Sequence, residues 1–316
     1  MDQPMTLKNN GQINIILNNE PVKPKPKKFS TTIPNPVVQP KPVIHHQPLK
    51  EIEAELKSLV GMDDLKKIIK EVYAWLYVNK KREEQGLKAG KQSLHMMFKG
   101  NPGTGKTTVA RLIGKLFHSM NVLSKGHLIE AERADLVGEY IGHTAQKTRD
   151  LIKKAMGGIL FIDEAYSLSR GGEKDFGKEA IDTLVNHMEA KREDFVLILA
   201  GYSKEMENFL TLNPGLRSRF PFVIDFPDYE VEELLEIAEQ MIAEREYHLS
   251  KDAYYKLKEH FLDIKYNRSL KDFSNGRYVR NVVEKSVRAQ AMRLLMEDRY
   301  QREELLTLTM EDISFS

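Results

Sequence analysis

The chain has 316 residues, 41% of them hydrophobic, and a formal net charge of +2. This length is enough to bury a sizeable core and predicts two folded units. The absence of cysteine excludes disulfides, thiol nucleophiles and cysteine-based zinc sites. We find no apolar run of the roughly 18 residues that a membrane span needs and no apolar core of a signal peptide, so we expect a soluble cytoplasmic protein.

Residues 1–50 differ in composition from the rest of the chain. They hold nine of the thirteen prolines and no arginine, and their seven lysines outnumber Asp2 and Glu20 to give a charge of +5, which leaves −3 for the remainder. This composition predicts a disordered tail. Lysine and proline in such a tail could also bind nucleic acid, an acidic partner or a membrane surface, so its role stays open.

The middle of the chain alternates between strand-like and helix-like runs. Apolar runs of strand length occur at residues 94–98, 127–129, 159–162, 195–199 and 222–226. Segments with helical spacing precede the first run and separate the others. The alternation predicts an α/β fold in which a parallel five-stranded sheet is flanked by helices.

The pattern changes after Pro227. No strand pattern follows, and residues 230–243 and 278–296 have the spacing of amphipathic helices. We therefore predict an α/β unit over residues 51–227 and a small helical unit over residues 228–316.

The sequence GNPGTGKT at residues 100–107 fits the pattern of a phosphate-binding loop. Gly100 and Gly105 let the backbone wrap closely enough for successive N–H groups to point at phosphate oxygens. Lys106 is then placed to reach the β- and γ-phosphates, and Thr107 to reach magnesium. The loop also opens a helix, whose N-terminal dipole favours anions. The predicted nucleotide-binding residues are Gly100, Asn101, Pro102, Gly103, Thr104, Gly105, Lys106, Thr107 and Thr108.

A second motif, ILFIDE, occupies residues 159–164. Its apolar run is typical of a strand buried on both faces, which delivers Asp163 and Glu164 to the sheet edge where ligands bind. We predict that Asp163 holds magnesium, directly or through water, and that Glu164 polarises the attacking water. The alternative is that the pair only caps the following helix. Both motifs together predict ATP hydrolysis with ATP and Mg²⁺ as cofactors.

These motifs, an arginine-containing segment before the last strand and a C-terminal helical region follow each other as in AAA+ ATPases. The segments LVGEYIGHTAQKTRDLIKKAMGGILFIDEAYSL, NPGLRSRF and VIDFPDY resemble more closely the CbbX-type AAA+ family, over about residues 51–316. That family includes bacterial rubisco activases and a sporulation protein. The resemblance implies a P-loop NTPase fold with a helical lid, and assembly into a homo-oligomer, expected to be a hexamer.

The resemblance also assigns roles to residues that spacing alone does not identify. Val60 and Gly61 match the segment that lines the adenine pocket. Arg219 matches the arginine finger that one subunit supplies to the next, with Arg217 as its neighbour. Such a finger is worth about 10³ to 10⁵ in rate. Arg277 matches the sensor-2 arginine, which contacts the γ-phosphate and links nucleotide state to lid angle.

The sensor-1 position departs from the family pattern. AAA+ modules usually end the fourth strand with an asparagine or another small polar residue, whereas VLILA is followed here by Gly201, Tyr202 and Ser203. Tyr202 is the candidate for this position, because its hydroxyl can form hydrogen bonds.

Tyr140, Ile141 and Gly142 resemble the loop that lines the central pore of AAA+ rings that thread a polypeptide. An aromatic ring there would grip a passing chain without regard to its sequence. The local alternative is a Tyr140 that packs over the turn before a helix capped by Thr144.

We therefore expect an oligomeric ATPase that remodels an unidentified protein client through a ring pore, with a role in sporulation implied by the resemblance. A rubisco-activase-like remodeller, a nucleic-acid motor or clamp loader, and a nucleotide-switched scaffold without turnover are the alternatives. The −3 charge of residues 51–316 makes nucleic acid the less favoured partner. Intact Lys106, Asp163 and Glu164 argue against a scaffold.

Overall fold

The computed structural model describes residues 47–57, 59–90, 92–140, 142–170, 176–267 and 273–315, which belong to one compact unit. Residues 1–46 of the predicted tail, and Ile141, therefore lie outside the described residues. None of the helices in the described ranges is both long and apolar enough to span a bilayer.

A parallel sheet of five strands forms the centre of the α/β region, in the order β2-β3-β4-β1-β5. The predicted sheet is confirmed, and strand bounds differ from the predicted ones by no more than one or two residues. Because β4 lies between β1 and β3, the loops that follow these three strands meet at one edge. The strands are β1 (Met96–Gly100), β2 (Leu128–Ala131), β3 (Ile159–Ile162), β4 (Val196–Gly201) and β5 (Phe222–Phe226).

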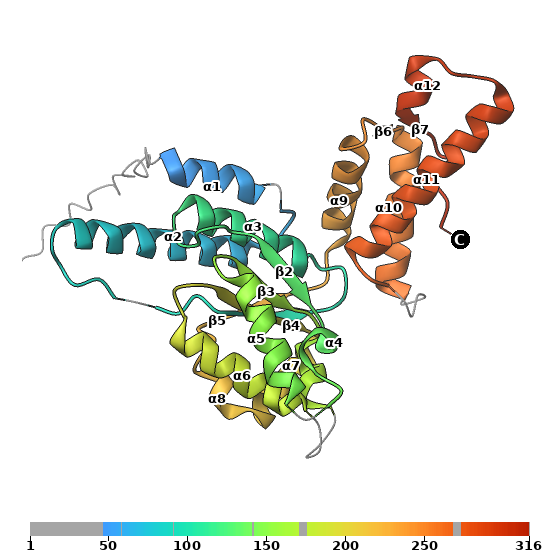
Figure 1. Ribbon diagram of the computed structural model, residues 1–316. Helices are drawn as coiled ribbons and strands as arrows, with labels where there is room; N and C mark the ends of the chain where they lie inside the picture. The colour runs from blue at the N-terminus through green and yellow to red at the C-terminus, as the bar shows by residue number, and fades with distance from the viewer. Residues whose placement is uncertain are drawn as a thin grey trace, which may run out of the picture. The chain divides into compact units, whose positions relative to one another are not determined.

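Helices cover both faces of this sheet (Figure 1). Met96 and Phe98 of β1 belong to the core shared with the first helix group, whereas Met97 belongs to the core shared with the second. All four residues of β3 are buried, which explains its continuous apolar run. The first group is α1 (Gln47–Lys57), α2 (Asp63–Glu84) and α3 (Lys106–Ser119); the second is α4 (Arg133–Leu136), α5 (His143–Ala155), η1 (Ala165–Ser169), α6 (Gly177–Ala190), α7 (Ser203–Leu212) and α8 (Pro214–Arg217).

The C-terminal region is mainly helical and has a core of its own. Its helices are α9 (Val231–Ala243), α10 (Lys251–Asn267), α11 (Gly276–Glu297) and α12 (Arg302–Leu306). The prediction that strands end at Pro227 is wrong, because β6 (His248–Leu249) and β7 (Thr307–Leu308) pair in parallel. Two residues per strand are too few to produce a recognisable alternation.

The buried stripe of α11 includes Val279, Val282 and Val283, as its spacing predicts. The stripe continues with Gln290, not with an apolar residue. The Gln290 side-chain amide donates to the carbonyl oxygens of three residues in and after α12, at 2.8–3.1 Å. This polar residue thus ties α11 to the α12–β7 segment, and its burial is offset by hydrogen bonds.

Candidate nucleotide-binding site

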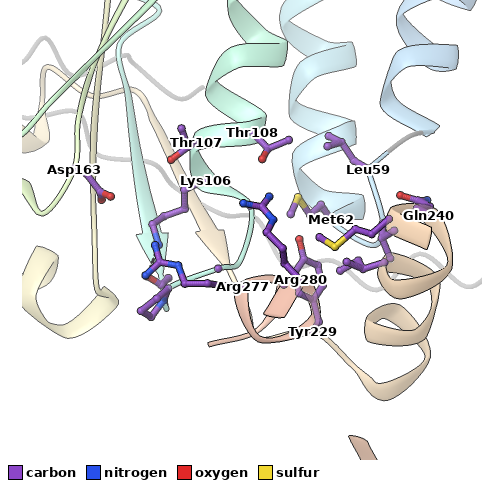
Figure 2. A pocket seen from close by; sticks show the side chains of 18 of the residues that line it. Leu59, Met62, Lys106, Thr107, Thr108, Asp163, Tyr229, Gln240, Arg277 and Arg280 are labelled. Atoms are coloured by element: carbon purple, nitrogen blue, oxygen red, sulfur yellow. Dashed lines mark hydrogen bonds between the residues drawn. The ribbon is translucent and has the colours of Figure 1, made fainter. Parts of the chain in front are cut away.

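The edge at which β1, β3 and β4 end borders a cleft of about 870 Å³ (Figure 2). Its walls come from the segment before α2, from the loops after these strands and from helices α9 and α11. A cleft of this size is in the range of small-molecule sites. The predicted residues that line it are Val60, Gly100, Pro102, Gly103, Gly105, Lys106, Thr107, Thr108, Asp163, Glu164, Tyr202 and Arg277.

The P-loop joins β1 to α3, and Gly105 is the left-handed N-cap of that helix, with φ 91°. Predicted residues Asn101 and Thr104 are not in the wall of the cleft; the Thr104 hydroxyl donates to the Asn101 carbonyl oxygen at 2.8 Å and so closes the loop on itself. Gly100 is required for a reason that the motif does not reveal. A Cβ at this position would lie 2.3 Å from the Phe226 carbonyl oxygen, because β5 runs directly beside it.

Lys106 begins α3 and lies inside the cleft. Its Nζ donates to the carbonyl oxygens of Gly100 and Asn101, both at 2.8 Å. Burial lowers the pKa of Lys106 below its ordinary value; the Asp163 carboxylate opposes this shift and Arg277 adds to it. The amine is thus held over the loop, between an acidic and a basic neighbour.

Asp163 and Glu164 follow β3 at the same edge. The Glu164 amide donates to Asp163 Oδ1 at 3.0 Å. Glu164 has left-handed backbone angles (φ 46°, ψ 42°), which cost a non-glycine residue of order 1–3 kcal/mol and occur most often at functional sites. Although Glu164 precedes η1, its side chain forms no capping hydrogen bond, so capping alone does not account for the pair.

Tyr202 lies directly after β4, between the P-loop and the acidic pair. Its ring centroid is 6.1 Å from that of Tyr166, a buried side chain of η1. Burial raises the pKa of Tyr166 to about 12, and the nearby Glu164 charge adds to this shift. The Tyr166 hydroxyl therefore stays protonated at neutral pH.

Helix α11 contributes two arginines to the cleft, Arg277 and Arg280. Figure 2 shows the side chains of Lys106 and Arg277 converging, with Asp163 on one side of the cleft. Among the described residues, the Arg277 guanidinium has no hydrogen-bond or ion-pair partner. This side of the cleft is thus suited to a polyanion.

The other side of the cleft has a more apolar lining, which sequence reasoning largely missed. Of the two residues predicted for this side, Val60 lines the cleft. Gly61 is not part of the wall, and its backbone is left-handed, with φ 63°. Figure 2 places Leu59, Met62 and Gln240 on the side away from Asp163. Most of the missed residues come from two segments separated by about 170 positions, which only the fold brings together; they are Leu59, Met62, Tyr229, Ile237, Gln240 and Met241. The charged residues Glu244 and Arg245, just after α9, and Glu284 of α11 line the cleft as well.

The two candidate finger arginines do not line this cleft. Arg217 is exposed at the end of α8, and Arg219 is half-buried just after it. Arg219 Nε donates to Glu189 Oε1 at 2.6 Å, and its Nη1 donates to the Gly215 carbonyl oxygen at 2.5 Å. The site of one chain therefore contains neither arginine.

The candidate pore residue Tyr140 is also far from being buried, with 65% of its surface exposed. Its ring meets that of His143 edge-on at 5.5 Å. Helix α5 begins at His143 with Gly142 as its N-cap, and the buried Thr144 hydroxyl accepts from the Gly138 amide. The N-cap is therefore Gly142 and not Thr144, whereas the contact with His143 is local packing before the helix, and the pore-loop role stays a prediction.

Comparisons with known proteins identify the family. The family model described as "ATPase family associated with various cellular activities (AAA)" matches residues 96–228, and that of the AAA lid domain matches residues 230–316. Stage V sporulation protein K of Bacillus subtilis (strain 168) is 66% identical over 99% of this chain and 97% of its own. Protein CfxQ of Xanthobacter flavus and protein CbbX of Cereibacter sphaeroides are each 47% identical, over 77% and 78% of this chain and 77% and 79% of their own. The chain belongs to the AAA family of ATPases, in the group that contains stage V sporulation protein K and the CbbX and CfxQ proteins.

Proposed function

We propose that this chain hydrolyses ATP with Mg²⁺ inside a homo-oligomeric ring, expected to be a hexamer, and uses the hydrolysis to remodel a protein client. One observation carries the proposal. A single cleft unites Lys106, the Asp163–Glu164 pair and Arg277, whereas the candidate finger Arg219 lies outside the cleft of its own chain. A site completed by a second copy accounts for both facts.

The two sides of the cleft suit the two parts of a nucleotide. Leu59, Val60 and Met62 offer apolar surface to a base, and Lys106 and Arg277 offer positive charge to phosphates. The helix dipole of α3 adds to the attraction for the phosphates. ATP is therefore the ligand that we assign to this cleft.

Thr107 and Asp163 would hold the magnesium ion. Both line the cleft, and a hydroxyl and a carboxylate are hard oxygen ligands of the kind that Mg²⁺ prefers alongside phosphate oxygens. The bound ion would supply neutralisation of the charge on the phosphate oxygens. Glu164, next to Asp163 and without a capping bond, is placed to orient and polarise the attacking water. Tyr202 is a weaker candidate for assisting it as sensor-1.

Arg219 is our candidate for the group that a neighbouring copy supplies. Its guanidinium is oriented on its own chain by the Gly215 carbonyl oxygen and by Glu189, which both Nε and Nη2 approach to 2.6 Å, so one hydrogen on Nη1 and one on Nη2 are left for another subunit. An arginine that acts across an interface makes hydrolysis depend on assembly.

The exposure of Tyr140, two residues before Gly142, supports a pore loop that touches a protein client, with Ile141 as its third member. The match to stage V sporulation protein K covers 99% of the chain and so takes in most of residues 1–46, whereas the CbbX and CfxQ matches cover about four fifths of the chain. We therefore place the function in sporulation. The 47% identity to CbbX and CfxQ favours the rubisco-activase-like remodeller as the second candidate.

A pair of variants tests the assignment of the site. Lys106→Ala should lose ATP binding, measured by isothermal titration calorimetry, together with phosphate release. Glu164→Gln should keep ATP binding, lose phosphate release, and hold the oligomer together with ATP in sedimentation velocity. Loss of ATP binding by a folded Glu164→Gln protein would show that the role of Glu164 is wrongly assigned. Full phosphate release by Lys106→Ala would contradict the proposed site.

A further inference from the structure

Four consecutive residues of the P-loop are each bonded to the segments that lead into the lid. The side-chain Nδ2 of Asn101 donates to the two carboxylate oxygens of Asp228, at 2.9 and 3.0 Å. The carbonyl oxygen of Gly103 accepts from the Gly276 amide at 3.0 Å, and that of Thr104 accepts from the Tyr229 hydroxyl at 3.2 Å. The carbonyl oxygen of Pro102, the remaining residue of the four, accepts a hydrogen bond from the Asn275 side chain.

Asn275 is the centre of these contacts. Its Nδ2 donates to the Pro102 carbonyl oxygen at 3.3 Å and to Asp228 Oδ1 at 2.8 Å, and its Oδ1 accepts from the Tyr229 amide at 3.0 Å. The residue is 1% exposed, so these bonds are not shared with bulk water. One side chain thus links the P-loop, the connection at Asp228–Tyr229 and the start of α11.

The backbone of Asn275 is held in an unfavourable conformation. Its angles are φ 51° and ψ −129°, a region that side-chain-bearing residues rarely occupy. The P-loop accommodates this turn at close range, because a Cβ on Gly103 would lie 1.9 Å from the Ser274 carbonyl oxygen. A residue kept in such a conformation by three hydrogen bonds points to a local geometric requirement.

We propose that Asn275 is a positioning residue that fixes Arg277 relative to the P-loop. Arg277 lies on the first turn of α11, directly after Gly276, whose amide is bonded to Gly103. The carbonyl groups of residues 102–104 are bound by the lid and its connection, which leaves the N–H groups of the loop for phosphates. A shift of the loop around phosphate is thereby transmitted to Arg277 through Asn275.

This inference rests on the proposed function, in which Arg277 contacts the γ-phosphate. It predicts that Asn275 matters for the discrimination between triphosphate and diphosphate, and not for the fold alone. The ratio of the dissociation constants for ADP and ATPγS, both with Mg²⁺, separates the two roles. Partial unfolding weakens both ligands by the same factor and leaves the ratio unchanged.

The experiment measures both constants by isothermal titration calorimetry in the full chain and its variants. Arg277→Ala should reduce the preference for ATPγS by about tenfold or more, the strength of a hydrogen bond to a charged group. Asn275→Ala should reduce it by a similar factor, and the double variant should show no further loss. Asn121→Ala is the matched control, because Asn121 has φ 58° at the end of α3 and lies outside the cleft.

A charge exchange keeps the test informative if Asn275→Ala folds poorly. Asn275→Asp alone places a second carboxylate beside that of Asp228, in place of the hydrogen bond between them, and should reduce the preference for ATPγS. Adding Asp228→Asn restores a donor–acceptor pair at this contact and should return the ratio toward that of the wild type.

Two outcomes overturn the inference. An unchanged ratio in folded Asn275→Ala, or effects of Asn275→Ala and Arg277→Ala that multiply in the double variant, would make Asn275 independent of Arg277. An unchanged ratio in Arg277→Ala itself would refute the proposed contact with the γ-phosphate, and the inference with it. The single arginine variant therefore tells the two failures apart.

Discussion

His95 is a buried histidine whose replacement should destabilise the α/β region. The side chain is 1% exposed; its Nδ1 accepts from the Leu197 amide at 3.0 Å, and its Nε2 lies 3.1 Å from the Met188 carbonyl oxygen. Because an amide can only donate to Nδ1, the proton is on Nε2 and is donated to Met188. The neutral ring thus satisfies one backbone group of β4 and one of α6.

The variant His95→Leu leaves both backbone groups buried without a partner. Each such group costs about 1–3 kcal/mol, so the free energy of unfolding should fall by about 2–6 kcal/mol. In His95→Asn, the side-chain oxygen can replace Nδ1 but nothing replaces Nε2, and about half of this loss is expected. Urea unfolding followed by far-ultraviolet circular dichroism measures both values.

The same side chain should make stability depend on pH. Burial lowers the pKa of His95 from its ordinary 6.5, so the unfolded chain takes up the proton at a higher pH than the folded one. Its contribution is complete above pH 6.5 and is lost as the pH falls from there toward the folded-state pKa, by up to about 1.4 kcal/mol per pH unit. Burial shifts the pKa of His260 in the same direction, so two histidines add to the wild-type slope.

Comparing His95→Asn with the wild type isolates the share of His95. Below pH 6.5 the wild type should lose stability more steeply than the variant, and the slopes should converge above it. Equal slopes in the two proteins, or a His95→Leu variant as stable as the wild type, would refute the reasoning.

Three further predictions concern the candidate pore loop, the lid and the contact between Arg219 and Glu189. Tyr140→Ala should leave basal phosphate release nearly unchanged but abolish stimulation by a client; a loss of basal turnover would instead indicate a structural tyrosine. Asp312→Ala should lower the free energy of unfolding by about 1.5–3 kcal/mol, because the half-buried Arg293 guanidinium loses its bidentate partner and keeps only the longer ion pair with Glu297; a loss below about 1 kcal/mol in urea unfolding would contradict this. Glu189→Gln should reduce phosphate release less than Arg219→Ala does, because the amide oxygen still accepts from Arg219 Nε; equal losses in the two variants would give Glu189 a role of its own.

The fold could be predicted where local sequence and global burial give the same signal. The run before Asp163 is apolar at every position because helices cover both faces of β3, so its pattern alone identifies a central strand. The P-loop is one continuous segment and so is the acidic pair. The residue types within each motif follow from the chemistry of phosphate and metal binding, so each can be found in the sequence. The strands β6 and β7 escaped detection because two residues hold no period.

The apolar side of the cleft could not be predicted from spacing. Met62 and Met241 lie far apart in sequence and line one cleft only because the fold brings the lid next to the segment before α2. Asn275 gives no sequence signal either, since its role depends on Pro102, Asp228 and Tyr229, which other segments supply. Contacts between distant segments, unlike motifs, leave no pattern in a single sequence.

The central claim is that the active site is shared between copies of the chain. It is tested most directly by the phosphate-release rate per subunit as a function of protein concentration, for the wild type, Arg219→Ala and a matched control. The control is Arg192→Ala, an exposed arginine that forms an ion pair with its neighbour Glu193 at 3.8 Å. A specific rate that rises with concentration in the wild type and the control, and collapses in Arg219→Ala, is the predicted result. A rate per subunit that is independent of concentration and of Arg219 would contradict the account.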